Sequence, residues 1–139
     1  ALVRSRLKWA VREWARCVNG GITTGVQVAG QLRELDGVMI GREAYPNPWW
    51  LASWDETFFA TGARELSRES VEEQMVGYMT REAAAHGTPW SSIARHMLGL
   101  RHGLPGARRW RQVWSDHKLK AMHPRDVMLL ARGDAQKAD

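Results

Sequence analysis

Two segments of the chain combine an apolar run with glycine, and both have residue types that bind phosphate. The first is CVNGGI at residues 17–22, and the second is DGVMIGREAYPNPWW at residues 36–50. Glycine lets backbone N–H groups approach an anion closely, and the guanidinium of Arg42, directly after Gly41, can pair with an anion bidentately. The alternative is that the glycines are ordinary turn residues and that Arg42 forms a surface ion pair.

Each segment predicts a short strand that ends at its glycines, the second at residues 37–40. About twenty residues separate the two segments, enough for one crossover helix between parallel strands. We expect that helix at residues 25–35, with Thr23 or Thr24 as its cap. Two adjacent strand–loop units of a (β/α)-barrel can supply a shared phosphate site near the end of the barrel. The two glycine turns are therefore predicted to lie side by side and to bind one anionic group.

A third segment, PGARRWRQVW at residues 105–114, predicts a helix with two chemically different sides. At about 100° per residue, Arg108 and Arg111 fall on one side. The residues on nearly the opposite side are apolar: Trp110, Val113 and Trp114. Residues 101–125 include seven lysines and arginines and one acidic residue. Such a helix suits the backbone phosphates of structured RNA, and the alternative is a solvated basic face.

The other periodic segments also predict helices. Residues 2–14 have a helical apolar period with a basic face, and residues 49–59 predict a short helix. A domain boundary is expected at residues 61–68, where glycine and polar residues follow an apolar run. Four short helices with short connections then predict an antiparallel bundle. Their expected ranges are 70–86, opened by a capping box of Ser70 and Glu73, then 90–98, 107–119 and 124–132.

The composition limits the possible function classes. The chain has 139 residues and a net charge of +5, which favours an acidic partner such as nucleic acid. Its one cysteine, Cys17, fits a reducing compartment and reads as a small core residue, so we expect a cytoplasmic protein. No apolar run reaches membrane-spanning length, and the five histidines lack the spacing of zinc ligands. Trp49 and Trp50 could stack on a base, but core packing explains them more simply.

Three ordered blocks of the sequence resemble one family. The blocks are VNGGI at 18–22, DGVMIGREAYPNPW at 36–49 and RHMLGLRHGLPGARRWRQ at 95–112. They resemble the C-terminal part of a bacterial tRNA-dihydrouridine synthase of the A subfamily. The resemblance implies an α/β plus α fold, mostly helical overall, in which the last two β/α units of a (β/α)8 barrel precede a four-helix bundle. It implies an FMN-binding barrel part at residues 1–61 and a helical tRNA-binding domain at residues 62–139.

The resemblance also implies a reaction and its participants. Members of that family reduce uridine to 5,6-dihydrouridine in tRNA with FMN and NADPH. Positions that match the family's FMN-phosphate residues are Asn19, Gly20, Gly21, Gly41 and Arg42, and those that match its tRNA-contacting arginines are Arg108 and Arg111. The family's catalytic cysteine belongs to an earlier barrel loop, so this chain is expected to be an inactive fragment without catalytic residues. For the full-length protein we expect a monomer that binds tRNA and FMN, and neither a metal nor a membrane.

Two other functions are compatible with the same residues. One is a stand-alone helical RNA-binding module without catalysis, and the other is a barrel flavoenzyme that acts on small molecules. A flavin spectrum would separate the flavoenzymes from the RNA-binding module. Salt-sensitive tRNA binding would separate the tRNA enzyme from the small-molecule enzyme.

Overall fold

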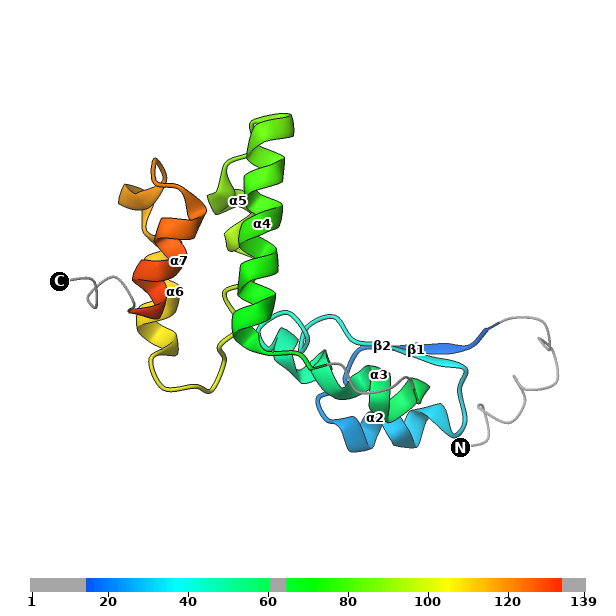
Figure 1. The fold of residues 1–139 in the computed structure, drawn as a ribbon. Helices are drawn as coiled ribbons and strands as arrows, with labels where there is room; N and C mark the ends of the chain where they lie inside the picture. Colours follow the sequence, from blue (N-terminus) through cyan, green and yellow to red (C-terminus); the bar gives the residue numbers. More distant parts are fainter. Residues whose placement is uncertain (1–14, 61–64, 134–139) are drawn as a thin grey trace. The chain divides into compact units, whose positions relative to one another are not determined.

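The structure is a computed structural model that describes residues 15–60 and 65–133 (Figure 1). The chain divides into two compact units, Ala1–Glu43 and Ala44–Asp139. The first contains a small two-stranded sheet and the second is helical, so the expectation of a mostly helical chain with a β/α part is confirmed.

Two sequence predictions cannot be compared with the structure. The predicted helix at residues 2–14 and the predicted domain boundary between residues 61 and 62 both lie outside the described residues.

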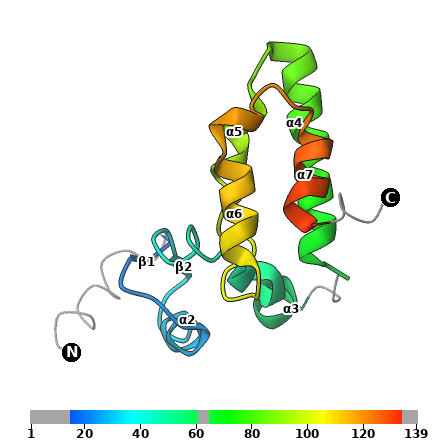
Figure 2. The same cartoon turned by 90° about the vertical axis from the view of Figure 1, so that its left-hand side faces the viewer.

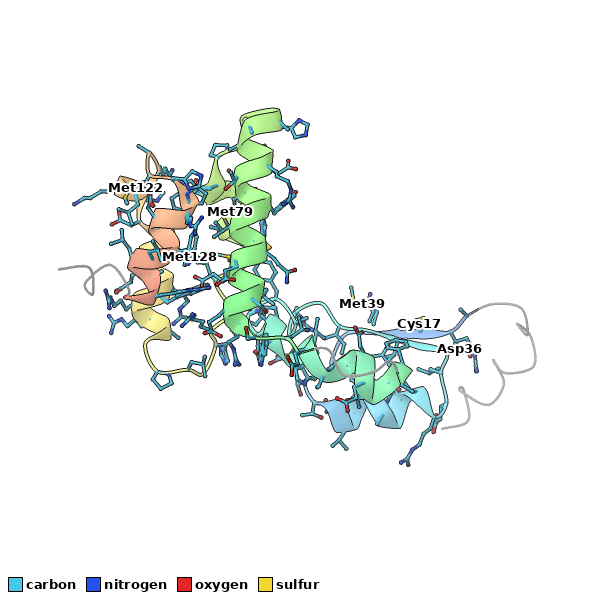
Figure 3. All side chains as sticks on the ribbon, viewed as in Figure 1. Cys17, Asp36, Met39, Met79, Met122 and Met128 are labelled. Atoms are coloured by element: carbon cyan, nitrogen blue, oxygen red, sulfur yellow. The ribbon has the colours of Figure 1, made fainter. Side chains whose placement is uncertain are left out.

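The first unit has a strand–helix–strand arrangement: β1 (Cys17–Asn19), α2 (Gly25–Leu32) and β2 (Gly37–Met39). The strands pair in parallel, with Cys17 opposite Gly37 and Asn19 opposite Met39, as the spacing of the two segments predicts. Because side chains alternate along a strand, these residues share one face of the sheet, and Cys17 and Met39 lie on the face away from α2 (Figure 3). The crossover helix therefore covers the other face, and it contacts β2.

A threonine cap starts α2 where the sequence predicts it. The Thr24 hydroxyl accepts a hydrogen bond from the Gln27 N–H at 3.3 Å, and the Gln27 carboxamide oxygen accepts one from the Thr24 N–H at 3.2 Å. The helix ends at Leu32, three residues before the predicted end at Leu35, and a turn follows it. Its sequence contains Gly30 and β-branched valines, which favour helix weakly, and of its residues only Val28 is buried. Packing through a single side chain accounts for so short a helix.

The described part of the second unit contains five α-helices and two 3-10 helices (Figures 1 and 2). In chain order they are a 3-10 helix at Pro48–Ser53, α3 (Trp54–Phe59), α4 (Arg68–His86), α5 (Trp90–Ala94), α6 (Ala107–Ser115), a 3-10 helix at His117–Leu119 and α7 (Pro124–Arg132). The long helix α4 packs on α5 and α7, and α6 packs on the same two helices. Met79 of α4 and Met128 of α7 are buried between these helices in one hydrophobic core (Figure 3).

The start of α4 differs from the prediction. A capping box is present, but it pairs Ser67 with Ser70, not Ser70 with Glu73. The Ser67 hydroxyl accepts from the Ser70 N–H at 3.0 Å, and the Ser70 hydroxyl accepts from the Ser67 N–H at 3.1 Å. The predicted box was wrong because the helix begins earlier than expected, with Ser67 as its N-cap and Ser70 as its third residue. The helix ends at Gly87 in the left-handed conformation, as predicted.

The later helices are shorter than their apolar periods suggest. Helix α5 stops at Ala94, and residues 95–104 form successive turns with i to i+3 hydrogen bonds, although Met97 is buried as the period predicts. Helix α6 stops at Ser115 instead of residue 119, because the Asp116 carboxylate accepts from the Lys118 N–H at 2.8 Å and starts a 3-10 helix. Helix α7 has the predicted limits.

Candidate functional site

The two glycine turns of the first unit line one depression. Its volume is about 290 Å³, and its lining comes from both turns: Gly20, Gly21, Ile22, Thr23, Met39, Ile40, Gly41, Arg42 and Glu43. The parallel pairing of β1 and β2 brings the turns together, since the carboxyl ends of both strands meet at one edge. The Gly20 N–H also donates to the Met39 carbonyl at 3.4 Å. The prediction that the turns lie side by side is confirmed.

Backbone conformation makes glycine necessary at the first turn. Gly20 and Gly21 have φ angles of +86° and +72°, in a region that other residues adopt at a cost. Within the described residues, the N–H groups of Gly21 and Gly41 have no protein acceptor. The N–H groups of Thr23 and Thr24 differ, because both donate to the Gln27 carboxamide oxygen. The depression is therefore lined by two glycines whose N–H groups no described residue uses.

The charges at this depression come from two side chains. Arg42 is exposed, and among the residues that the structure describes no carboxylate forms an ion pair with it. Glu43 contributes a carboxylate to the same lining. With one guanidinium and one carboxylate, the lining side chains sum to zero charge. Anion binding here would depend on the direction of N–H groups and of the Arg42 side chain more than on net charge.

Asn19 occupies a different position from the other four predicted residues. It is the last residue of β1, it pairs with Met39, and it is absent from the lining of the depression. Its side chain is on the sheet face that Cys17 and Met39 share. The structure thus brings Gly20, Gly21, Gly41 and Arg42 together and places Asn19 immediately before them.

The helix α6 has the two sides that its sequence predicts. Arg108 and Arg111 are exposed, whereas Trp110 and Trp114 are buried with 1% and 2% of their surfaces accessible. The tryptophans pack in the core of the helical unit. The two guanidiniums are therefore presented to solvent from a helix that is fixed on its opposite side.

A second depression lies in the helical unit. Its volume is also about 290 Å³, and it is lined in part by basic side chains and hydroxyl groups: Ser91, Ser92, Arg95, Ser115, His117 and Lys120. Ser115 lies four residues after Arg111 and therefore on the same side of α6. The basic side of α6 thus continues into a hollow with further cationic groups, although Asp116 also lines it.

A buried glutamate was not predicted from the sequence. Glu72 of α4 has no accessible surface, and its carboxylate accepts hydrogen bonds from tryptophan and arginine side chains. The donors are Trp110, Trp114, Arg101 and Arg132, and together with Glu72 they form the Glu72 cluster. One signal was available: Glu72 lies in line with the buried Val76 and Met79 at helical spacing, so it interrupts an apolar side of α4.

Arg132 connects α7 to α4 in this cluster. Its Nε donates to Glu72 at 2.9 Å, its Nη1 to Glu73 at 2.9 Å, and its Nη2 to the Glu69 carbonyl at 2.8 Å. Burial alone lowers the pKa of Arg132, but the hydrogen bonds and charges of the two glutamates outweigh it, so the pKa is raised above its usual value. Because the pKa of Arg132 is higher in the folded than in the unfolded chain, the charged guanidinium stabilises the fold. That stabilisation is fully present at any pH below the pKa of the unfolded chain. This stabilisation is lost only in strong alkali and is constant near neutral pH.

Two of the sequence blocks contact each other inside the helical unit. The Tyr45 hydroxyl lies 3.0 Å from Nδ1 of His96, and a Cβ added to Gly99 would lie 2.7 Å from the Pro46 carbonyl carbon. The segment from Tyr45 to Trp49 therefore packs on the turns at residues 95–104. Nearby, the Arg68 guanidinium lies 4.4 Å from the Trp49 ring centroid, which favours the packing interpretation of this tryptophan over a free stacking surface.

Other predicted features are located as follows. Cys17 is exposed on β1, not a core residue as predicted, because none of the described helices covers the sheet face that carries it. Within residues 15–60 and 65–133, no group of three histidine, cysteine, aspartate or glutamate side chains has the arrangement of a metal site. Among the described helices, none has both the length and the hydropathy to cross a membrane.

Comparisons with known proteins agree on one family. Residues 6–133 match the family described as dihydrouridine synthase (Dus). The chain is 42% identical over 119 residues to the tRNA-dihydrouridine(20/20a) synthase of Shewanella oneidensis, which covers 86% of this chain and 35% of that protein. The corresponding enzyme of Pseudomonas syringae pv. tomato is 43% identical over 122 residues, covering 88% of this chain and 36% of the relative. That of Escherichia coli K12 is 42% identical over 104 residues, covering 75% and 30%.

The chain belongs to the dihydrouridine synthase family, and the resemblance predicted from three sequence blocks is confirmed. These relatives are tRNA-dihydrouridine(20/20a) synthases. The chain spans about a third of the length of the curated relatives it matches.

Proposed function

We propose that the chain is part of a protein that reduces uridine to 5,6-dihydrouridine in tRNA, with FMN as cofactor and NADPH as reductant. In this proposal β1 and β2 are the last two strands of a (β/α)8 barrel, and α4 to α7 are the four-helix bundle of a tRNA-binding domain at residues 62–139. The observation that carries it is the single depression lined by Gly20, Gly21, Gly41 and Arg42. In this proposal the chain supplies a phosphate clamp and a set of tRNA-docking helices.

The residues of the depression fit the phosphate of FMN. Two glycines with positive φ expose backbone, the Gly21 and Gly41 N–H groups have no protein acceptor among the described residues, and the exposed Arg42 supplies a guanidinium. These are groups that bind a phosphate through N–H bonds and a bidentate cation. Asn19, immediately before the glycines, completes the proposed set. When bound, FMN would supply the hydride chemistry at C5–C6 of the uracil ring.

The residues of this chain would bind and orient and would not perform the chemistry. The glycine turns and Arg42 would fix the position of the phosphate end of the cofactor, because their donors directly follow two paired strands. None of the residues of this chain is proposed as the catalytic acid. The uracil must leave the base stack of folded tRNA to reach a flavin, so binding of the tRNA body must be rigid.

The proposed tRNA-docking surface is the basic side of α6. Arg108 and Arg111 are exposed on a helix whose other side is buried. The basic side of this helix continues to the depression that is lined by Arg95 and Lys120. Guanidiniums on a rigid helix can contact the backbone phosphates of RNA, which proteins recognise largely by shape and charge.

The flavin part is tested by Arg42→Ala in a protein that carries the complete barrel. Loss of a bidentate charge-assisted pair should weaken FMN binding by about tenfold or more. The measurement is FMN dissociation followed by flavin fluorescence, because free FMN is fluorescent and its release is easily titrated. The matched control is Arg33→Ala, an exposed arginine of the same unit outside the depression, which should leave FMN affinity unchanged. Equal affinities in both variants would contradict the clamp.

The RNA part is tested by Arg108→Ala with Arg111→Ala. Each lost phosphate contact should reduce the slope of log affinity against log salt by about one, so the double variant should lose about two and bind tRNA roughly tenfold more weakly. Filter binding at four salt concentrations gives both quantities. The control is Arg109→Ala, which removes an arginine of the same helix whose side chain extends to the end of α7. A slope equal to that of the unsubstituted chain would contradict the docking surface.

A further inference from the structure

A buried carboxylate at the centre of the helical unit has four donors. Oε1 of Glu72 accepts from Nε1 of Trp110 at 2.6 Å and from Nε1 of Trp114 at 2.9 Å. Oε2 accepts from Nε of Arg132 at 2.9 Å and from Nη2 of Arg101 at 3.4 Å. Both oxygens are thus satisfied by side chains from outside α4, and the carboxylate connects α4 to α6 and α7.

Stability alone is a weak reason for such an arrangement. A carboxylate without accessible surface loses its hydration, and the attraction of its partners at best roughly balances that cost. A well-packed apolar side chain in the same place is often equally stable or more so. What an apolar side chain cannot supply is direction, because hydrophobic contact is non-directional whereas a hydrogen bond restricts both distance and angle.

The direction is imposed on one helix in particular. Trp110 and Trp114 are four residues apart and therefore lie on one side of α6, one turn apart. Both indole N–H groups point to the same oxygen, so neither rotation of α6 about its axis nor a shift along it can preserve the two bonds. The rings are also held edge to face, with centroids 6.2 Å apart. Helix α6 is thus fixed in rotation from its buried side.

The exposed side of α6 contains Arg108 and Arg111, so the same bonds determine where these guanidiniums point. We propose that Glu72 is a positioning residue for RNA binding: through the two indoles it sets the rotation of α6 and so aims Arg108 and Arg111 at backbone phosphates. This proposal rests on the proposed RNA-docking role of α6. Arg101 and Arg132 hold the carboxylate itself, since both donate to its other oxygen.

The main variant is Glu72→Met, which keeps the length of the side chain and removes both acceptors. In the 139-residue chain it should weaken tRNA binding by about fivefold or more and reduce the salt slope by about two, because the arginines lose their alignment. Adding Arg108→Ala and Arg111→Ala to it should then change the slope little further. The Trp110 and Trp114 indole N–H signals should move in the proton–nitrogen NMR spectrum, since hydrogen bonding to a carboxylate shifts such protons.

The control is Glu73→Met, which removes the neighbouring glutamate. Glu73 is exposed and also binds Arg132, but both indole N–H groups donate to Glu72 instead. Charge alone predicts that loss of either carboxylate strengthens RNA binding, so opposite effects of the two variants distinguish positioning from electrostatics. If Glu72→Met does not fold, Trp110→Phe with Trp114→Phe removes the same two bonds from the donor side and should give the same loss of slope.

Two results would overturn the proposal, and they differ in meaning. The first is obtained with a folded Glu72→Met or double phenylalanine variant. If removal of Arg108 and Arg111 from that variant still lowers tRNA affinity and the salt slope as much as in the unsubstituted chain, Glu72 does not position the two arginines. If removing the two arginines has no effect in the unsubstituted chain, the RNA role of α6 fails first and positioning fails with it. The indole signals would still show whether the bonds to Glu72 form, so the two failures are distinguishable.

Discussion

Gly99 shows how one missing Cβ lets two distant segments pack together. A Cβ at this position would lie 2.7 Å from the Pro46 carbonyl carbon and 2.8 Å from Cδ of Pro48, closer than real Cβ atoms approach such groups. The obstacle is backbone and a proline ring, neither of which can rotate away. The same region is joined by the contact of the Tyr45 hydroxyl with His96. Space, and not backbone conformation, therefore requires glycine here.

We expect Gly99→Ala to lower the free energy of unfolding of the helical unit by about 1 to 3 kcal/mol, the usual cost of overpacking. Thermal unfolding followed by circular dichroism measures it. The matched control is Gly77→Ala in α4, where the added Cβ would meet only the end of the flexible Arg81 side chain at 3.5 Å. That change should be neutral or stabilising by up to about 1 kcal/mol, because alanine favours helix. Equal melting temperatures for both variants would contradict the packing argument.

Local periodicity was sufficient for some residues and insufficient for others. The exposure of Arg108 and Arg111 and the burial of Trp110 and Trp114 follow from helix geometry within a single segment, and they were predicted. The role of Glu72 depends on donors 29 to 60 residues away, which no local pattern contains. Asn19 was grouped with the glycines by resemblance, and only the pairing of β1 with β2 shows that it lies outside the lining of the depression.

At the scale of elements, end signals determined the helices more reliably than apolar periods did. Pro124 and Gly133 gave the limits of α7, and Thr24 gave the start of α2. The ends of α2, α5 and α6 were predicted too late. After α5 the reason is that the apolar period continues through turns that bury the same residues. Met97 illustrates the reason: it is buried, but from a turn after α5. The periodicity correctly predicted that Met97 is buried, but it overestimated how far the hydrogen-bonded helix extends.

The capping box at Ser67 gives a prediction for α4. Ser67→Ala removes the acceptor of the Ser70 N–H, so it should destabilise the helical unit by about 1 kcal/mol and lower its melting temperature by about 4 to 8 °C. Ser67→Asp should retain most of the stability, since aspartate is an equally good cap and favours the positive helix end. A melting temperature unchanged in Ser67→Ala would show that α4 starts elsewhere in solution.

At the scale of the whole molecule, apolar burial is very unequal between the two units. The described hydrophobic core and the side chains packed against it come from residues 49–131, all within the unit Ala44–Asp139. In the described part of the other unit only Ile22 and Val28 are buried apolar residues, and its sheet has two strands. A two-stranded sheet with so little buried surface is marginal in water. Val26 of α2, with 84% of its surface accessible, shows how open this unit is.

We therefore expect residues 44–139 to fold without residues 1–43. The shortened chain should unfold in one cooperative transition within about 4 °C of the main transition of the whole chain, because it keeps every residue of the core. It should also retain the indole signals of Trp110 and Trp114, which report the Glu72 cluster. Residues 1–43 alone should show no cooperative transition. If the shortened chain melts far below the whole chain, the strand unit contributes to the stability of the helices. Separate core formation in the helical unit would then be the wrong description of how this chain folds.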